Sequence, residues 1–351
     1  MKYLFIIFLF FLTSCNNSNT ESVQLVSDSA VVKPHEDIFI RCLAPDGFHF
    51  AQGKVIILNS CGDYPLQIID LANDKEHWVG SFGDGPNEIG HAGGMLSYVD
   101  EPNLLIKVID QRKQSIVRIM AKDDEYYLQE EKSFPPVISV YKDVIELNDG
   151  SILYNRQQAE YNIGKWMPGG EELFVMDFQP DIGFPEGSRD DGWLAEKGMA
   201  YYNSLIVNPN SGKIVQILRM YPYMIAYDDQ LQLLEIKQTE GKIPQLDWSL
   251  SGSRKFEGFP FLSLEAQAGS DYFYVLNPRL IYRPFSKEEP IDPSIDIYNW
   301  DMELVASLKL DKLLRNFTID FKNKKLYGVT FGSADQVLGE VSIPASLHPF
   351  F

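Results

Sequence analysis

The sequence is short of positive charge, and this limits what the protein can bind. Its 351 residues contain 31 Lys and Arg against 49 Asp and Glu, a formal net charge of -18 at pH 7. A surface of that sign repels nucleic acid and anionic lipid headgroups, so neither is an expected partner. The acidic residues are dispersed along the chain rather than gathered in a tail, which is typical of a solvated globular surface.

Motifs of common catalytic and nucleotide-binding sites are also missing. The sequence has no G-x-S-x-G elbow, no P-loop, and no H-x-H or H-E-x-x-H spacing among its five histidines. His77 and His91 flank a glycine-rich stretch but lack a nearby cysteine or carboxylate at zinc-ligand spacing, so we expect no metal and no cofactor. Catalytic residues that assemble from distant segments would leave no local motif, so an enzyme stays open as an alternative.

The longest apolar run is too short to span a bilayer. This run, YLFIIFLFFL at residues 3–12, would extend about 15 Å as a helix, half of a hydrocarbon core of about 30 Å. Lys2 before it and small residues after it complete a secretion signal. LTSC, residues 12–15, resembles the lipobox of bacterial lipoproteins, which implies cleavage before Cys15 and lipidation of that residue.

This resemblance divides the chain into a signal peptide at residues 1–14, a lipidated Cys15 with a polar tether to residue 35, and one domain over residues 36–351. Glu21 is the acidic residue that closely follows the cysteine, whereas exported surface lipoproteins often carry an acidic run there. We therefore expect a lipid-anchored protein of the bacterial cell envelope that faces the periplasm.

Besides Cys15, the sequence contains Cys42 and Cys61. Export permits a disulfide between them. If their flanking strands formed a simple hairpin, the two cysteines would lie at opposite ends, too far apart for a bridge. Both a disulfide and a pair of buried free thiols remain open.

No stretch after the leader has a long helical period. Instead, short runs rich in Val, Ile, Tyr and Phe, bounded by Asn, Asp, Gly and Pro, recur from Ile38 to the C-terminus. They group into six clusters, with turn signals at residues 148–150 and 208–212 inside two of them. The pattern predicts an all-β domain, a six-bladed β-propeller, with seven blades possible.

Two segments carry a family resemblance. WVGSFGDGPNEI followed by LLIKVID and SIVRIM, and later IDIYNWDMELVASL followed by FTIDFKNKKLYGV, resemble six-bladed propeller lipoproteins of the TolB-like and NHL-like kind. The resemblance implies a propeller fold and a binding or scaffold role, since such families mostly serve those purposes. It implies no particular reaction.

The glycine-rich stretch GSFGDGPNEIG, residues 80–90, is expected to be a structural turn. Gly83 and Gly85 begin a G-x-G-x-x-G phosphate-binding pattern, but Glu88 stands at the third glycine position and Pro86 is not followed by a helix. We predict a turn built by Gly83, Gly85 and Pro86, with φ > 0 for at least one of the two glycines. Glu88 is expected to accept hydrogen bonds within that turn.

Two further stretches, residues 179–198 and 277–294, are longer than simple connections need to be, and long loops are commonly functional. Arginine binds carboxylates and phosphates, and aromatic rings stack on sugars or side chains. The ligand-binding candidates are Arg189, Trp193, Arg279, Tyr282 and Arg283. The alternative for the arginines is pairing with the protein's own carboxylates.

The sequence thus predicts an envelope propeller that binds a protein, peptide or glycan partner and touches the membrane through its lipid anchor only. The alternative is a propeller lyase or hydrolase with its site in the central funnel.

Overall fold

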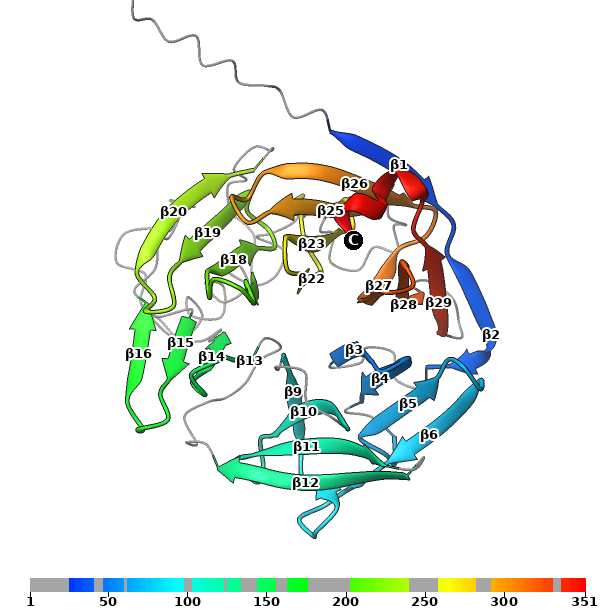
Figure 1. Ribbon diagram of the computed structural model, residues 1–351, viewed down its shortest axis with the longest axis vertical. Coiled ribbons are helices and arrows are strands. Elements are labelled where there is room, and N and C mark those ends of the chain that lie inside the picture. The colour runs from blue at the N-terminus through cyan, green and yellow to red at the C-terminus, as the bar shows by residue number, and fades with distance from the viewer. Residues whose placement is uncertain are drawn as a thin grey trace, which may run out of the picture.

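The computed structural model describes residues 25–40, 47–59, 62–97, 103–122, 125–133, 144–155, 163–175, 203–239, 258–281, 292–330 and 336–351. These residues form antiparallel sheets arranged as blades around a common axis (Figure 1). The arrangement is a six-bladed β-propeller, so the predicted fold class is confirmed.

The first three blades follow one another along the chain. Blade 1 contains β3 (Gly47–Ala51), β4 (Lys54–Leu58), β5 (Leu66–Asp70) and β6 (Lys75–Val79). Blade 2 contains β9 (Ala92–Ser97), β10 (Leu104–Asp110), β11 (Ser115–Lys122) and β12 (Glu125–Ser133). Blade 3 contains β13 (Val144–Glu146), β14 (Ile152–Asn155), β15 (Ile163–Trp166) and β16 (Glu172–Val175). The innermost strands β9 and β13 pair in parallel, which joins blades 2 and 3 into one sheet.

The remaining blades include strands from both ends of the described chain. Blade 4 contains β17 (Asn203–Val207), β18 (Ile214–Leu218), β19 (Tyr223–Tyr227) and β20 (Leu233–Gln238). Blade 5 contains β22 (Glu265–Ala268), β23 (Tyr272–Asn277), β25 (Ser294–Asn299), β26 (Leu304–Leu310) and β1 (Val26–Ala30). Blade 6 contains β27 (Leu314–Asp320), β28 (Lys325–Thr330), β29 (Val337–Ser342) and β2 (Lys33–Phe39).

The N-terminal strands close the ring. β2 pairs antiparallel with β29 as the outermost strand of blade 6, and β1 pairs in parallel with β26 on the outer edge of blade 5. Figure 1 shows β1 and β2 wrapping around these two neighbouring blades. Among the described residues, sheet structure therefore begins at Val26, within the segment that the sequence assigned to the tether, because blade 5 takes β1 and blade 6 takes β2 from the other end of the chain.

Four very short strands lie outside the blades. β7 (Ser81–Phe82) pairs in parallel with β8 (Glu88–Ile89), and β21 (Pro260–Phe261) pairs with β24 (Leu280–Ile281). β24 lies between the second and third strands of blade 5 in the sequence, but it pairs with β21 and not with that blade. Blade 5 takes its third strand from Ser294–Asn299.

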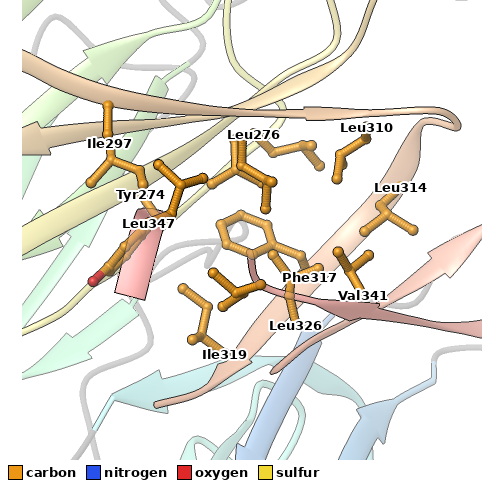
Figure 2. Close-up of a cluster of buried hydrophobic side chains, with 14 of the residues drawn as sticks. Tyr274, Leu276, Ile297, Leu310, Leu314, Phe317, Ile319, Leu326, Val341 and Leu347 are labelled. Atoms are coloured by element: carbon orange, nitrogen blue, oxygen red, sulfur yellow. The ribbon is translucent and has the colours of Figure 1, made fainter. Parts of the chain in front are cut away.

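Apolar side chains fill the space between neighbouring blades. The largest described cluster lies between blades 5 and 6 and includes Leu276, Phe317 and Leu326, each completely buried (Figure 2). Leu347, from the 3-10 helix η3 (Ala345–Phe350), enters the same cluster. The C-terminal helix thus packs into the core at the point where the ring closes.

The two ends of the ring differ in their connections. The innermost strands of all blades finish at the same end of the ring. There, short turns join the strands of each blade, and the longest of these turns span residues 98–103 and 208–213. At the other end, the longest connections span residues 176–202, 239–264 and 278–293. We name these the turn end and the loop end.

Asx turns shape the turn end. Asp70 Oδ1 accepts from Ala72 N at 3.0 Å, Asn208 Oδ1 from Asn210 N at 2.8 Å, and Asp228 Oδ1 from Gln230 N at 2.9 Å. A short side chain that bonds the backbone two residues later stabilises a tight reversal. The predicted turns at residues 148–150 and 208–212 both lie at this end, between β13 and β14 and between β17 and β18.

Lysines link neighbouring blades at the turn end. Lys165, completely buried in blade 3, donates to Asp149 Oδ2 at 3.2 Å and to the Asp229 carbonyl of blade 4 at 2.7 Å. Lys213 of blade 4 donates to the Trp300 carbonyl of blade 5 at 2.6 Å. A buried ammonium needs such partners, because its desolvation is otherwise costly. These bonds connect the turns of blades 3, 4 and 5.

Candidate binding face at the loop end

The residue 80–91 segment is the best-defined long connection of the loop end. Lys113, in the turn between β10 and β11, donates to the carbonyls of Gly85 at 2.8 Å and Glu88 at 2.7 Å. Asp110, at the end of β10, accepts from Gly90 N at 2.7 Å and His91 N at 3.2 Å. Blade 2 therefore holds a loop that leaves blade 1, and presents its outer residues in one conformation.

The predicted turn is present, but the predicted backbone geometry is wrong. Neither Gly83 nor Gly85 has φ > 0, whereas Gly80 has φ 76° and Asn87 has φ 64°. The glycines are needed for a different reason. Glu88 Oε2 accepts from Gly85 N at 2.5 Å, and a Cβ on Gly85 would lie 2.8 Å from that oxygen.

A Cβ on Gly83 would overlap the same carboxylate. The two glycines thus make room for Glu88, whose role as a hydrogen-bond acceptor within the turn is confirmed. Pro86, the third predicted turn residue, is exposed at the tip. Only the folded loop shows that a side chain, rather than the backbone dihedral, excludes larger residues.

Polar side chains occupy the loop-end portions of the innermost strands in blades 4 to 6. Asn155 Nδ2 of blade 3 donates to Asn203 Oδ1 at the start of β17 at 3.0 Å, and both residues are buried. Glu265, the first residue of β22, accepts from Asn316 Nδ2 of β27 at 3.4 Å. Hydrogen bonds between side chains therefore cross from blade 3 to blade 4 and from blade 5 to blade 6.

Blade 4 adds a buried arginine to this region. Arg219, directly after β18, is 5% exposed, and its Nη2 lies 3.4 Å from Ser204 Oγ on β17. Arg315, on β27 of blade 6, is half-buried, and burial lowers the pKa of its guanidinium. Guanidinium groups among the polar side chains of the loop end are suited to carboxylate or phosphate ligands.

Asn59 and Ser263 are buried polar side chains at the loop end whose polar atoms have no hydrogen-bond partner within the described residues. Asn59, after β4, is 1% exposed, and neither its Oδ1 nor its Nδ2 has a partner among the described residues. Ser263, before β22, is completely buried, and its Oγ likewise has none within the described ranges.

Arg279 is the one predicted ligand-binding residue that the structure describes. It follows β23 at the loop end, in a left-handed conformation with φ 49°, and its backbone N–H donates to Asn277 Oδ1 at 3.0 Å. Its Nη2 lies 3.9 Å from Asp296 Oδ1, while 47% of the side chain is exposed. Asp296 itself is buried and accepts from Ser294, Ser307 and Asn277. Arg279 thus approaches one of the protein's own carboxylates and keeps an exposed face.

The other predicted residues lie outside the described residues. These are the lipidation residue Cys15, the ligand-binding candidates Arg189, Trp193, Tyr282 and Arg283, and the cysteines Cys42 and Cys61. The strands that flank residues 176–202 and 278–293 end and begin at the loop end. Asn203, Glu265 and Asn316 were not among the predicted site residues, although each lies near the start of the innermost strand of a blade.

The described residues contain neither a candidate metal site nor a membrane-spanning helix. The described ranges contain no group of three His, Cys, Asp or Glu that could hold a metal ion. His77, one of the two histidines near the glycine-rich stretch, packs edge-on against Tyr126 with ring centroids 4.9 Å apart. Within the described chain, no helix has the length and apolar character needed to cross a bilayer.

Comparison with solved structures finds other propellers. The chain is similar to a member of the duf4221 family from Bacteroides vulgatus, with a TM-score of 0.56 and 14% identity over 90% of this chain and 97% of that one. It is also similar to a Bacteroides fragilis protein named "Putative exported protein", with a TM-score of 0.50 and 11% identity over 92% and 100%. No protein-family model and no curated protein matches the sequence. These similarities support the fold alone.

Proposed function

We propose that this protein is a lipid-anchored propeller of the bacterial cell envelope, of the TolB-like or NHL-like type, that binds a protein, peptide or glycan at its loop end. The observation that carries the proposal is the difference between the two ends of the ring. Short hydrogen-bonded turns close one end, whereas the long connections attach to the other. A rigid scaffold that presents variable loops on one face is the usual arrangement of a binding protein.

The chemistry of the loop end supports recognition of a polar partner. Arg279 offers a half-exposed guanidinium, and the ordered loop at residues 80–91 presents Asp84 and Pro86. The segments that carry Arg189, Trp193, Tyr282 and Arg283 begin and end at the same face. Arginine forks and aromatic rings together are the groups that dominate binding energy at protein interfaces.

The cellular location rests on the leader, on LTSC at residues 12–15, and on the exported relative from Bacteroides fragilis. Replacing Cys15 by Ser tests the anchor. We expect the Cys15→Ser protein to leave the membrane fraction and appear in the soluble periplasmic fraction. A variant that still sediments with membranes as the wild type does would refute lipidation at this residue.

Site-specific photo-crosslinking in cells tests the binding face. A benzophenone amino acid is placed at Asp84 or Arg279 on the loop end, and at Asn210 or Gln230, which are exposed on the turn end. We expect discrete adducts with a macromolecular partner from the loop-end positions and none from the turn-end controls. Adducts of equal yield from both ends, or only from the turn end, would contradict the proposal.

A further inference from the structure

Exposed apolar side chains gather at the turn end of blades 5 and 6, where the chain enters the ring. Leu25 precedes β1 and is 47% exposed, while Leu304, at the start of the neighbouring strand β26, is 36% exposed. Phe321, in the turn between β27 and β28, is 38% exposed. Phe350 and Phe351 are partly exposed at the end of η3. We name these five residues the entry patch.

Ring contacts connect the aromatic residues of the entry patch to blade 5. The ring of Tyr274 lies 5.6 Å from that of Phe321 and 4.9 Å from that of Phe351, which stacks on it. Phe350 packs edge-on against Tyr272 at 5.5 Å. η3 also contacts both β1 and β26 (Figure 1).

A hydrogen bond ties the same helix to the first strand. Ser346 Oγ donates to Asp28 Oδ2 at 2.5 Å. The patch therefore extends from the blade 6 turn, across η3, to the first residues of β1. To bury the entry patch, an apolar surface must contact the propeller at the turn end of blades 5 and 6.

Lysines flank the aromatic rings in a chain whose net charge is strongly negative. Lys322 is exposed in the turn that carries Phe321, and Lys324 donates to the carbonyl of Phe351. Lys325 pairs with Glu340 at 2.9 Å. Aromatic rings that insert at headgroup level, with lysines reaching toward phosphates, are the combination found at membrane–water interfaces.

The short stretch of sequence between Cys15 and the entry patch indicates which surface the patch contacts. Residues 16–24 join Cys15 to Leu25. A connection of that length reaches at most about 35 Å even when fully extended. If Cys15 carries acyl chains, the turn end of blade 5 is held close to the bilayer that contains them.

We infer that the entry patch rests on the bilayer surface and directs the loop end away from the membrane. This inference relies on the proposed lipidation of Cys15, and it departs from the sequence-based expectation that only the lipid anchor touches the membrane. The net charge disfavours a strongly anionic surface. A zwitterionic surface supplies both the apolar boundary that the aromatic rings need and phosphates that the exposed Lys322 can contact.

Photo-crosslinking to lipid tests the inference. The full-length lipidated protein is reconstituted in phosphatidylcholine vesicles with a benzophenone amino acid at Phe321 or at Leu25. Matched controls place it at Leu233, an exposed apolar residue of β20 that is 53% exposed, and at Asp84 on the loop end. We expect lipid adducts from Phe321 and Leu25 at several times the yield from both controls.

Equal yields at Leu233, a higher yield at Asp84, or an absence of lipid adducts from vesicle-bound protein would overturn the inference. The double variant Phe321→Asp with Lys322→Glu sharpens the test. It should lower the lipid-adduct yield from the Leu25 probe severalfold, while Leu233→Asp leaves that yield unchanged. Thermal melting verifies that each variant is folded.

A second form separates this inference from the anchor on which it relies. In this form, residues 1–15 are replaced by a hexahistidine tag that attaches the chain to nickel-chelating lipids. If the native form fails to float with vesicles, lipidation at Cys15 is refuted. The tagged form then tests whether the entry patch contacts lipid, by the same comparison of adduct yields. It is attached to the vesicle directly before residue 16, as the lipidated form is.

Discussion

The turn end and the loop end of this propeller are built by different means. At the turn end, each reversal is short and is held by nearby groups, such as Asp70 with Ala72 or Asn208 with Asn210. At the loop end, the one long connection that is fully described is held by residues of the next blade, Asp110 and Lys113. Hydrogen bonds within each reversal thus shape the turn end, where lysines add links among blades 3, 4 and 5, whereas the loop at residues 80–91 is held by blade 2.

This difference separates stability from recognition. The ring closes through β2, which completes blade 6, while β1 and η3 contribute side chains to the core between blades 5 and 6. Loop-end side chains such as Asp84 and Arg279 are about half exposed and contribute little to that core. Substitutions at the two ends should therefore change different measurements.

The largest effect is expected for Leu347→Ala. Leu347 is completely buried where η3 enters the closure core, and truncating such a leucine costs about 2–5 kcal/mol because a cavity remains. Urea unfolding of purified protein measures this loss. The control Leu173→Ala, at a residue 36% exposed on β16, should cost less than about 1 kcal/mol. Equal losses in both variants would show that η3 is not part of the core.

A pH effect is expected from the innermost strand β3. Burial lowers the pKa of His49 to about 4 from an ordinary value of 6.5. The unfolded chain therefore binds a proton more readily than the folded one between these values, and stability falls as pH decreases through that window. Between pH 7 and pH 5 the loss from this residue is about 2 kcal/mol.

Urea unfolding at both pH values checks this, with His49→Gln as the control. Glutamine does not ionise, so the variant should lose less stability between pH 7 and pH 5 than the wild type by about the same 2 kcal/mol. The same pH dependence in both proteins would mean that His49 is not shielded from protonation by the fold.

A smaller effect is expected for Gly83→Ala on the loop end. The added Cβ would displace the Glu88 carboxylate from Gly85 N, and the lost hydrogen bond is worth about 1 kcal/mol. Gly169→Ala is the matched control, because its Cβ meets no atom within 4 Å and its φ is not positive. Adding Glu88→Ala to Gly83→Ala should remove the steric conflict. If the two glycine variants melt alike, Glu88 does not determine the need for glycine.

The smallest effect is expected for Asp84→Ala, which removes an ion pair with Arg112 at 2.7 Å. Both side chains are about 60% exposed, and exposed pairs contribute below about 0.5 kcal/mol. Thermal melting should hardly change. If the loop end is the binding face, Asp84→Ala should reduce the yield of partner adducts from a benzophenone amino acid at position 279. An unchanged adduct yield together with lower stability would assign Asp84 a structural role instead.

Particular residues show how far the sequence predicted the fold. Alternating apolar residues and Asx or glycine turns, such as residues 148–150 and 208–212, predicted the hairpins, because a hairpin is specified by neighbours in the chain. The clusters predicted the blades for the same reason. The boundary at residue 36 missed β1 and the start of β2, because their partners β26 and β29 lie at the far end of the sequence.

The candidate site was less predictable. Arg279 was identified from its residue type and its position in a long connection. Asn203, Glu265 and Asn316 were missed, since each is an ordinary polar residue within a strand-like run, and only the ring brings their blades together. The need for glycine at position 83 was predicted, but its cause was assigned to φ rather than to the Glu88 carboxylate.

Local sequence alone determined that this protein is made of short antiparallel strands and tight Asx and glycine turns, and it predicted export and lipidation through residues 1–15. Those properties depend on residues close together in the chain. Tertiary structure decided which strands close the ring, which end carries the long connections, and that Phe321 and Phe351 both contact Tyr274. These arrangements depend on contacts between residues hundreds of positions apart, which the burial of apolar surface between blades selects only once the whole ring has formed.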